Sequence, residues 1–176
     1  PVLIDVPIDI QQQVVQDPVF PDQVHIRGYN PSVRGNDKQI THVVDAIAAA
    51  ERPVICAGGG VFLSKAYLEL ETFAARTRIP VVTTMMGLSL LPTDHPLNMG
   101  MIGTHGNVCA NKALAKSDLL IMIGTRAADR AIFSPEEIQR RMPSIHIDVD
   151  PAEIGKNLSP WWATPGSSFS SCCSGT

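Results

Sequence analysis

The chain has 176 residues and a mass of 19.0 kDa, which suits a single domain. Its formal net charge is −3, from 14 basic and 17 acidic side chains, and no basic cluster could neutralise the phosphates of a nucleic acid. The apolar fraction of 44% is sufficient for a packed core. The composition therefore excludes a largely disordered chain and argues against a nucleic-acid partner.

No uncharged apolar run approaches the roughly 20 residues that span a bilayer, and no signal-peptide pattern opens the chain. The cysteines are too few for a disulfide framework and lack the spacing of zinc ligands; they are Cys56, Cys109, Cys172 and Cys173. We expect a soluble, cytoplasmic protein without membrane contact or bound metal, with Cys56 and Cys109 buried. Because the chain opens inside an apolar run, we also expect it to be part of a longer protein.

The first elements along the chain are a short strand, a linker and a helix. The apolar run at residues 2–6 predicts the strand, and a proline-rich stretch without helical periodicity extends to residue 35. Apolar side chains then recur at i, i+3, i+4 and i+7, which predicts an amphipathic helix that ends near residue 51. Asp37 is placed to cap its first turn.

Short apolar runs alternate with helical patterns in the rest of the chain. Strands are predicted at residues 53–57, 80–84, 118–123 and 144–148, and helices at about 67–74, 107–116 and 135–141. The strands lack polar alternation, which is typical of a parallel sheet covered by helices on both faces. The sequence therefore predicts a three-layer α/β/α, Rossmann-like domain with a mostly parallel sheet of about five to six strands.

In such a sheet, ligands bind outside the carboxyl ends of the strands. Four segments follow predicted strand ends, at residues 58–60, 84–87, 124–126 and 148–150. The first is a run of three glycines, which fits a backbone cradle for an anionic ligand and equally a tight turn. Asp148 fits an acceptor for ribose hydroxyls or a solvated strand end, whereas Asp150 fits better as a helix cap.

Further polar residues near this edge have two interpretations each. His105 lies in a glycine-rich segment and suits a structural hydrogen bond better than a catalytic base. Arg126 and Arg130, with Asp129 between them, fit a phosphate or carboxylate site or a solvated loop. The sequence contains no P-loop, nucleophile elbow, H-E-x-x-H motif or catalytic carboxylate pair. The residues alone therefore predict a nucleotide-binding α/β domain without catalytic residues.

Several longer strings, all in the order of one family, carry a more specific resemblance. The strings are PVLIDVP at residues 1–7, RPVICAGGGV at 52–61, TTMMGL at 83–88, GMIGTHG at 100–106, GTRAADR at 124–130 and IHIDVDPAEIGKN at 145–157. With these strings, the chain resembles the central domain of the catalytic subunit of the acetolactate synthase (acetohydroxyacid synthase) family, which depends on thiamine diphosphate.

The resemblance implies a carboligase, a transferase of branched-chain amino-acid biosynthesis that condenses two 2-oxo acids with decarboxylation. It implies that residues 1–35 are the exit strand of a pyrimidine-binding domain and a linker, and that 36–158 form the central domain, which binds FAD. The catalytic glutamate, thiamine diphosphate and magnesium belong to the pyrimidine- and pyrophosphate-binding domains, so the chain alone is expected to be inactive. A homo-oligomer and a regulatory subunit are the further partners implied.

The resemblance also implies which residues contact FAD: Gly58, Gly59, Gly60, Thr84, Met85, Met86, His105, Gly124, Arg126, Asp148 and Val149. Asp129 and Arg130 match the family's pair at the mouth of the substrate channel, and Arg27 is similar to a linker arginine that reaches FAD.

The chain departs from the family pattern at Thr104, where methionine is usual, and at Ala127 and Ala128, where phenylalanine and aspartate are usual. These departures leave open three related enzymes as alternative parent proteins: glyoxylate carboligase, sulfoacetaldehyde acetyltransferase and an inositol-pathway dione hydrolase. A non-catalytic nucleotide-binding module, such as a subunit of an electron-transfer flavoprotein, is the alternative from another class.

The tail at residues 159–176 leaves the family pattern, which continues Val-Pro-Val-Val-Gly-Asp-Ala. Codons GTC CCC GTG GTG GGC GAC GCC for those residues, read one base late, give the observed Ser-Pro-Trp-Trp-Ala-Thr-Pro. We therefore predict a frameshift near Leu158, loss of the sheet's last strand, and a disordered tail in which Cys172 and Cys173 have no role.

Overall fold

The computed structural model describes residues 3–20, 35–126, 138, 140–150 and 153–154, and the backbone of 161–163. The chain divides into two compact units, Pro1–Asn30 and Pro31–Thr176. In the first unit, residues 3–7 form no strand and Ile8–Gln11 form a four-residue helix, α1. The strand predicted at residues 2–6 is therefore wrong over residues 3–6. The stretch that showed no helical periodicity nevertheless contains the short helix α1. Leu3 and Ile4 are exposed, since no described strand of this unit offers them a hydrogen-bonded partner.

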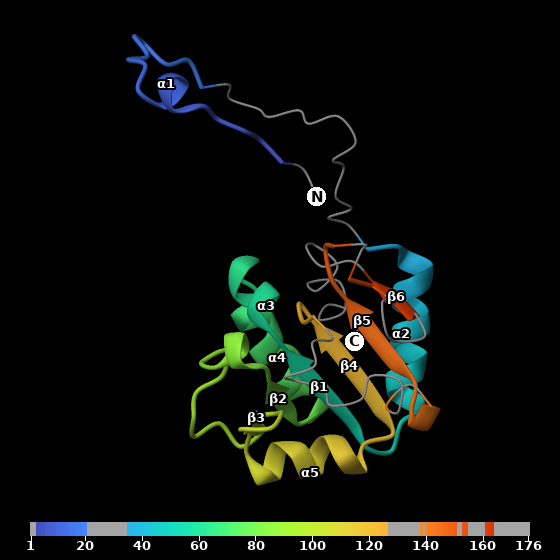
Figure 1. Ribbon diagram of the computed structural model, residues 1–176. Coiled ribbons are helices and arrows are strands. Elements are labelled where there is room, and N and C mark those ends of the chain that lie inside the picture. The colour runs from blue at the N-terminus through green and yellow to red at the C-terminus, as the bar shows by residue number, and fades with distance from the viewer. Residues whose placement is uncertain are drawn as a thin grey trace. The chain divides into compact units, whose positions relative to one another are not determined.

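The second unit is built on a six-stranded sheet in which each pair of neighbours is parallel, as expected (Figure 1). The spatial order is β3-β2-β1-β4-β5-β6. The strands are β1 (Pro53–Ala57), β2 (Val81–Thr83), β3 (Asn98–Met101), β4 (Leu119–Ile123), β5 (Ser144–Ile147) and β6 (Trp161–Ala163). Because all strands run in the same direction, their carboxyl ends share one edge of the sheet.

Helices cover both faces of the sheet and confirm the three-layer architecture. One face packs against α2 (Asp37–Ala49), α3 (Gly59–Leu63) and α4 (Tyr67–Thr77), through side chains such as Val43, Val61 and Leu70. The other face packs against α5 (Val108–Lys116) and the segment around Ile138. A 3₁₀ turn, η1 (Met85–Gly87), follows β2. The alternating residues of β1 and β4 divide between the two cores, so both strand faces are buried.

The cap of α2 differs from the prediction. Asn36, not Asp37, is the N-cap residue, and its side-chain oxygen accepts a hydrogen bond from the Lys38 amide at 3.0 Å. Asn36 has extended backbone, which lets its side chain reach the first turn, whereas Asp37 already lies inside the helix. The helix ends at Ala49, two residues earlier than expected.

Two strands were not predicted correctly. The sequence pattern missed β3, because its residues Asn-Met-Gly-Met form no apolar run and Gly100 has a φ of +87°. The expected loss of the last strand is also wrong, since Trp161–Ala163 pair in parallel with Ile145–Ile147 (Figure 1). Tryptophan has a high β propensity, and the free edge of β5 offers a ladder of backbone partners.

The cysteine prediction is half right. Cys56 is buried in β1, and burial raises the pKa of its thiol to about 12, so it remains a neutral thiol. Cys109, in the first turn of α5, is exposed instead of buried. Among the described residues, no helix is long and apolar enough to cross a membrane, and no three His, Cys, Asp or Glu side chains gather as metal ligands would.

Candidate functional site

The carboxyl edge of the sheet contains a topological switch point between β1 and β4. From β1 the chain continues to β2 on one side, and from β4 it continues to β5 on the other (Figure 1). Adjacent strands whose connections leave in opposite directions open a crevice beyond their carboxyl ends, where doubly wound folds bind ligands. Gly58 follows β1 and Gly124 follows β4, so the two predicted glycine segments meet at this crevice.

The two glycine segments are in direct backbone contact. The Gly58 amide donates to the Ile123 carbonyl at 3.0 Å, and the Gly60 amide donates to the Gly124 carbonyl at 2.9 Å. A Cβ on Gly124, whose φ is +57°, would lie 2.7 Å from the Gly60 Cα. The amides of Gly58 and Gly60 are therefore used inside the chain, and these glycines are needed for close packing of the α3 turn on the β4 turn.

The end of β2 adds an apolar rim next to the crevice. Thr84 is half-buried, whereas Met85 and Met86 in η1 are exposed at 76% and 73%. A Cβ on Gly59 would lie 3.0 Å from the Met86 Cβ, so η1 packs directly on the first residue of α3. The structure thus places the predicted residues 58–60 and 84–86 side by side.

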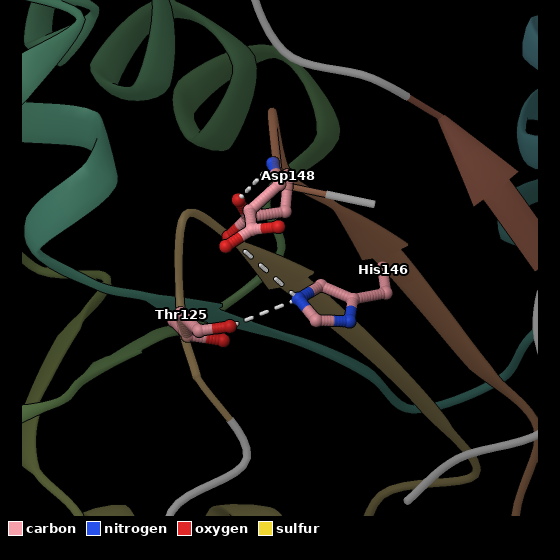
Figure 2. Close-up of polar contacts among 4 residues, drawn as sticks. Thr125, His146 and Asp148 are labelled. Atoms are coloured by element: carbon pink, nitrogen blue, oxygen red, sulfur yellow. Dashed lines mark hydrogen bonds and ion pairs between the residues drawn. The ribbon is translucent and has the colours of Figure 1, made fainter. Parts of the chain in front are cut away.

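A buried histidine joins the turns after β4 and β5 (Figure 2). The His146 Nε2 lies 2.9 Å from the Thr125 carbonyl oxygen and 3.9 Å from an Asp148 carboxylate oxygen. A carbonyl oxygen only accepts, so Nε2 carries the proton and donates it to Thr125. The other Asp148 oxygen accepts a hydrogen bond from the Asp150 amide at 2.9 Å. This contact network fixes the turn that holds Asp148 at the edge of the sheet.

The ionisation of His146 follows from its position. Burial is the main influence and lowers the pKa of the imidazole below its ordinary value. The hydrogen bond to the Thr125 carbonyl and the negative charges of Asp148 and Glu153 act in the opposite direction but are weaker. His146 is therefore neutral near pH 7 and acts as a hydrogen-bond donor.

Two buried hydroxyls at this edge lack a hydrogen-bond partner among the described residues. They are the Oγ1 atoms of Thr83, the last residue of β2, and Thr125, the second residue after β4. An unpartnered buried hydroxyl costs free energy, on the order of 1–3 kcal/mol. Thr125 also packs on the crevice, since its Cγ2 lies 2.7 Å from where a Cβ of Gly58 would be.

The remaining predicted residues divide between this edge and parts of the chain that are not described. Arg126 and Val149 are exposed immediately beyond β4 and β5, and His105 is exposed in the loop after β3. Asp129, Arg130 and Arg27 lie outside the described residues, as do the predicted helix start at 134–137 and the cysteines at 172 and 173. The predicted segment 124–126 contained Thr125 without giving it a role, and sequence reasoning missed His146 inside β5 and Asn111 inside α5, whose side chains contact the turns at this edge.

The opposite edge of the sheet has a different character. A groove of about 510 Å³ lies there, and its charged lining residues are Glu51, Arg52, Arg78 and Lys116. The helices α2, α4 and α5 end at this edge. Helix C-termini carry partial negative charge, so the cations compensate helix dipoles. Asp118 accepts hydrogen bonds from the amides of Glu51 and Arg52, both at 2.9 Å, and ties β4 to the turn before β1.

The fold and the switch-point crevice define a doubly wound, Rossmann-like α/β domain, and comparison with known proteins gives its family. Residues 40–166 match the family described as "Thiamine pyrophosphate enzyme, central domain", so the chain belongs to that family. The resemblance found in the sequence is confirmed by curated relatives. The chain is 44% identical over 162 residues to a probable acetolactate synthase large subunit from Methanococcus aeolicus, and 46% identical over 156 residues to an acetolactate synthase large subunit from Corynebacterium glutamicum.

These matches cover most of this chain but little of the relatives. They include 90% and 89% of this chain, and 27% and 25% of the Methanococcus and Corynebacterium proteins. A probable acetolactate synthase large subunit from Methanocaldococcus jannaschii, 45% identical over 160 residues, matches 90% of this chain and 27% of its own length. The chain thus spans about a quarter of the length of these relatives.

Proposed function

We propose that this chain is the central domain of an acetolactate synthase large subunit and that its carboxyl edge binds FAD. The observation that carries the proposal is the meeting of the Gly58–Gly60 and Gly124 turns with Asp148 at the switch-point edge of the sheet. The identities of 44–46% to proteins named acetolactate synthase support the enzyme class. Doubly wound folds bind dinucleotides at such an edge.

The fit of a dinucleotide to the residues present rests on four features. Gly59 is half-buried beside Met86 at the first turn of α3, and Arg126 supplies an exposed guanidinium for the pyrophosphate. Asp148 is partly exposed, with a side-chain exposure of 13%, and its second carboxylate oxygen can accept ribose hydroxyls. The buried Thr125 hydroxyl at the same crevice has no hydrogen-bond partner within the part of the chain that the structure describes.

The flavin ring requires an apolar surface, and the η1 turn supplies it. Met85 and Met86 are exposed thioether side chains next to Gly59, and methionine adapts well to a flat aromatic ring. Thr84, His105 and Val149 complete the set of contacts. Gly58, Gly60 and Gly124 contribute by allowing the turns to approach each other, since their packing leaves no room for a Cβ.

In the whole protein, thiamine diphosphate bound by the other domains would supply the electron sink for decarboxylation of a 2-oxo acid. The domain proposed here has no catalytic residue; it holds FAD and, through Asp129 and Arg130, lines the substrate channel. We propose that the whole protein also has a pyrimidine-binding domain and a pyrophosphate-binding domain, with bound magnesium. We further propose that it forms a homo-oligomer with a regulatory subunit. Its proposed location is the cytoplasm and its proposed role is in branched-chain amino-acid synthesis.

The test is a titration of the purified 176-residue chain with FAD, followed by flavin fluorescence and with folding checked by circular dichroism. We expect saturable binding that is weakened about tenfold by Asp148→Asn and by Met86→Ser, a loss of about 1.4 kcal/mol. Matched controls are Asp45→Asn on α2 and Leu68→Ser on α4, an exposed carboxylate and an exposed apolar residue on helices of the layer that packs against one face. These variants should bind FAD as the parent chain does.

Two results would overturn the proposal. A folded chain that leaves the flavin signal unchanged up to about 1 mM FAD would exclude a functional flavin site on it. Equal losses from the site variants and their controls would place the binding elsewhere. The enzyme class has its own test, because the flanking coding sequence should encode a pyrimidine-binding domain upstream and a pyrophosphate-binding domain downstream.

A further inference from the structure

The loop between β3 and α5 has a buried base and an exposed tip. Ile102 and Gly103 at its base are buried, whereas Thr104 and His105 at its tip are exposed. The Ile102 amide donates to the Thr83 carbonyl at 3.0 Å, which attaches the loop to the carboxyl end of β2. The tip therefore projects from an anchored base at the edge where the dinucleotide is proposed to bind.

Asn111, in the second turn of α5, holds the base of this loop. Its side-chain oxygen accepts from the Gly103 amide and its side-chain nitrogen donates to the Gly103 carbonyl, both at 3.0 Å. The Gly103 carbonyl also accepts from the Gly106 amide at 2.9 Å, closing a tight turn around the tip. One half-buried amide thus satisfies both backbone groups of a residue whose φ is +105°.

Other contacts fix the ends of the loop. The Asn107 amide donates to the Met101 carbonyl at 2.7 Å and closes the loop at its exit. Gly106 packs so tightly that a Cβ there would lie 2.9 Å from the Gly103 nitrogen. Between these ends, the Asn111 side chain holds both the amide and the carbonyl of Gly103. Without it, Gly103 keeps the hydrogen bond from the Gly106 amide to its carbonyl but loses the partner of its own amide, and glycine permits a wide range of backbone conformations.

We propose that Asn111 is a positioning residue, which fixes the Gly103 peptide so that His105 is held ready to contact the bound dinucleotide. The inference rests on the function proposed above. Asn111 raises the affinity for the dinucleotide without touching it, because it orders the loop that carries His105. An exposed contact residue contributes more to binding when its loop is ordered beforehand, because less conformational entropy is lost on binding.

Asn98, the first residue of β3, provides a matched control on the strand that precedes the loop. Its side chain also makes an amide clamp, accepting from the Gly100 amide at 3.0 Å and donating to the Pro92 carbonyl at 3.0 Å, but at the start of β3. Asn111→Ala and Asn98→Ala each remove one half-buried asparagine that holds backbone groups; Asn98 has one contact more, from its Nδ2 to the Leu91 carbonyl at 3.4 Å. We expect both to lower the melting temperature, but only Asn111→Ala to weaken FAD binding, by about tenfold.

A double-mutant cycle separates positioning from general destabilisation. If Asn111 acts through His105, Asn111→Ala should weaken FAD binding by less than about twofold once His105→Ala is present, because coupled residues are not additive. Asn98→Ala should have the same small effect with and without His105. Equal tenfold losses from Asn111→Ala in both backgrounds, or an equal loss from Asn98→Ala, would overturn the inference.

Amide hydrogen exchange of the ligand-free chain tests the loop itself. We expect Asn111→Ala to speed exchange at Gly103 and Gly106 while Asn98→Ala leaves both unchanged. If the parent chain binds no FAD, the proposed function fails, and unchanged exchange in Asn111→Ala then also removes the ordering role. If FAD binds and exchange does not change, the proposed function stands and the positioning role alone is overturned.

Discussion

The two edges of the sheet are formed by the same strands but differ in packing: the amino edge is open and the carboxyl edge is closely packed. At the amino edge, three helices end around a groove of about 510 Å³, and the charges of Arg52, Arg78 and Lys116 face their C-termini. At the carboxyl edge, the turns after β1 and β4 are in backbone contact through Gly60 and Gly124. The open groove therefore lies away from the edge where the dinucleotide is proposed to bind.

The difference in packing between the two edges can be seen at two residues with the same backbone φ angle. Gly124 and Arg78 have the same left-handed φ of +57°, one at each edge. At Arg78 the amino edge accommodates a long side chain, whereas at Gly124 a Cβ would lie 2.8 Å from the Val61 nitrogen. The same strained conformation is thus occupied by a side chain where there is space and by glycine where two backbones meet.

The largest expected effect is that of Gly124→Ala. The substitution adds a left-handed strain of about 1–2 kcal/mol and a steric conflict with the Gly60 and Val61 backbone worth a further 1–3 kcal/mol. We expect the free energy of unfolding, measured by urea denaturation, to fall by about 3 kcal/mol. Because the Gly58–Gly60 turn must move, FAD binding should be lost as well.

Arg78→Ala is the matched control, since it places the same alanine at the same φ. We expect it to change the free energy of unfolding by less than about 0.5 kcal/mol, as exposed substitutions do. A loss below about 1 kcal/mol for Gly124→Ala would show that the two turns can separate without cost, and the close packing of the carboxyl edge would no longer explain its glycines.

The next effect is a pH dependence at the carboxyl edge. Burial lowers the pKa of His146 in the folded chain, so the unfolded chain takes up a proton first as the pH falls. Relative to His146→Gln, which keeps an N–H donor for Thr125, the wild-type chain should lose at most about 2 kcal/mol between pH 6.5 and pH 5. Above about pH 7 the stability difference should be constant.

Urea denaturation at a series of pH values measures this difference, and the variant removes the contributions that all other groups share. A wild-type chain that gains stability relative to His146→Gln on acidification would mean that Asp148 and Glu153 outweigh burial. The imidazole would then be a cation in the folded chain and would donate to the Thr125 carbonyl as an imidazolium instead of a neutral ring.

The sequence predicted the parts of the fold that depend on continuous apolar runs and missed those that depend on neighbours. The strands β1, β2, β4 and β5 are short buried runs, and their parallel order follows from the intervening helices. β3 was missed because it is an edge strand with a glycine in a left-handed conformation. The glycines of the site were identified, but their mutual packing is a contact between residues 64 positions apart, Gly60 and Gly124, which no local pattern contains.

A weaker pH dependence is expected at the amino edge. Desolvation raises the pKa of Asp118, but the hydrogen bonds from the Arg52 and Glu51 amides outweigh it, so the pKa of the carboxyl lies below its ordinary value. Its contribution to stability is therefore complete above about pH 4 and is lost as the pH falls further. Asp118→Asn should have a lower melting temperature at pH 7, with the gap closing below about pH 4. A gap unchanged down to about pH 3 would contradict this contribution.

The smallest effect is expected from Arg78→Gly, which tests whether the left-handed backbone conformation of Arg78 lowers the stability of the chain. Glycine adopts the left-handed cap conformation without the penalty of about 1–2 kcal/mol, but it also loses more conformational freedom on folding, by about 0.5–1 kcal/mol. The net result should be a chain about 0.5 kcal/mol more stable to urea, with FAD binding unchanged because the groove lies at the opposite edge. A loss of stability would mean that the Arg78 guanidinium compensates the α4 dipole by more than the backbone strain costs.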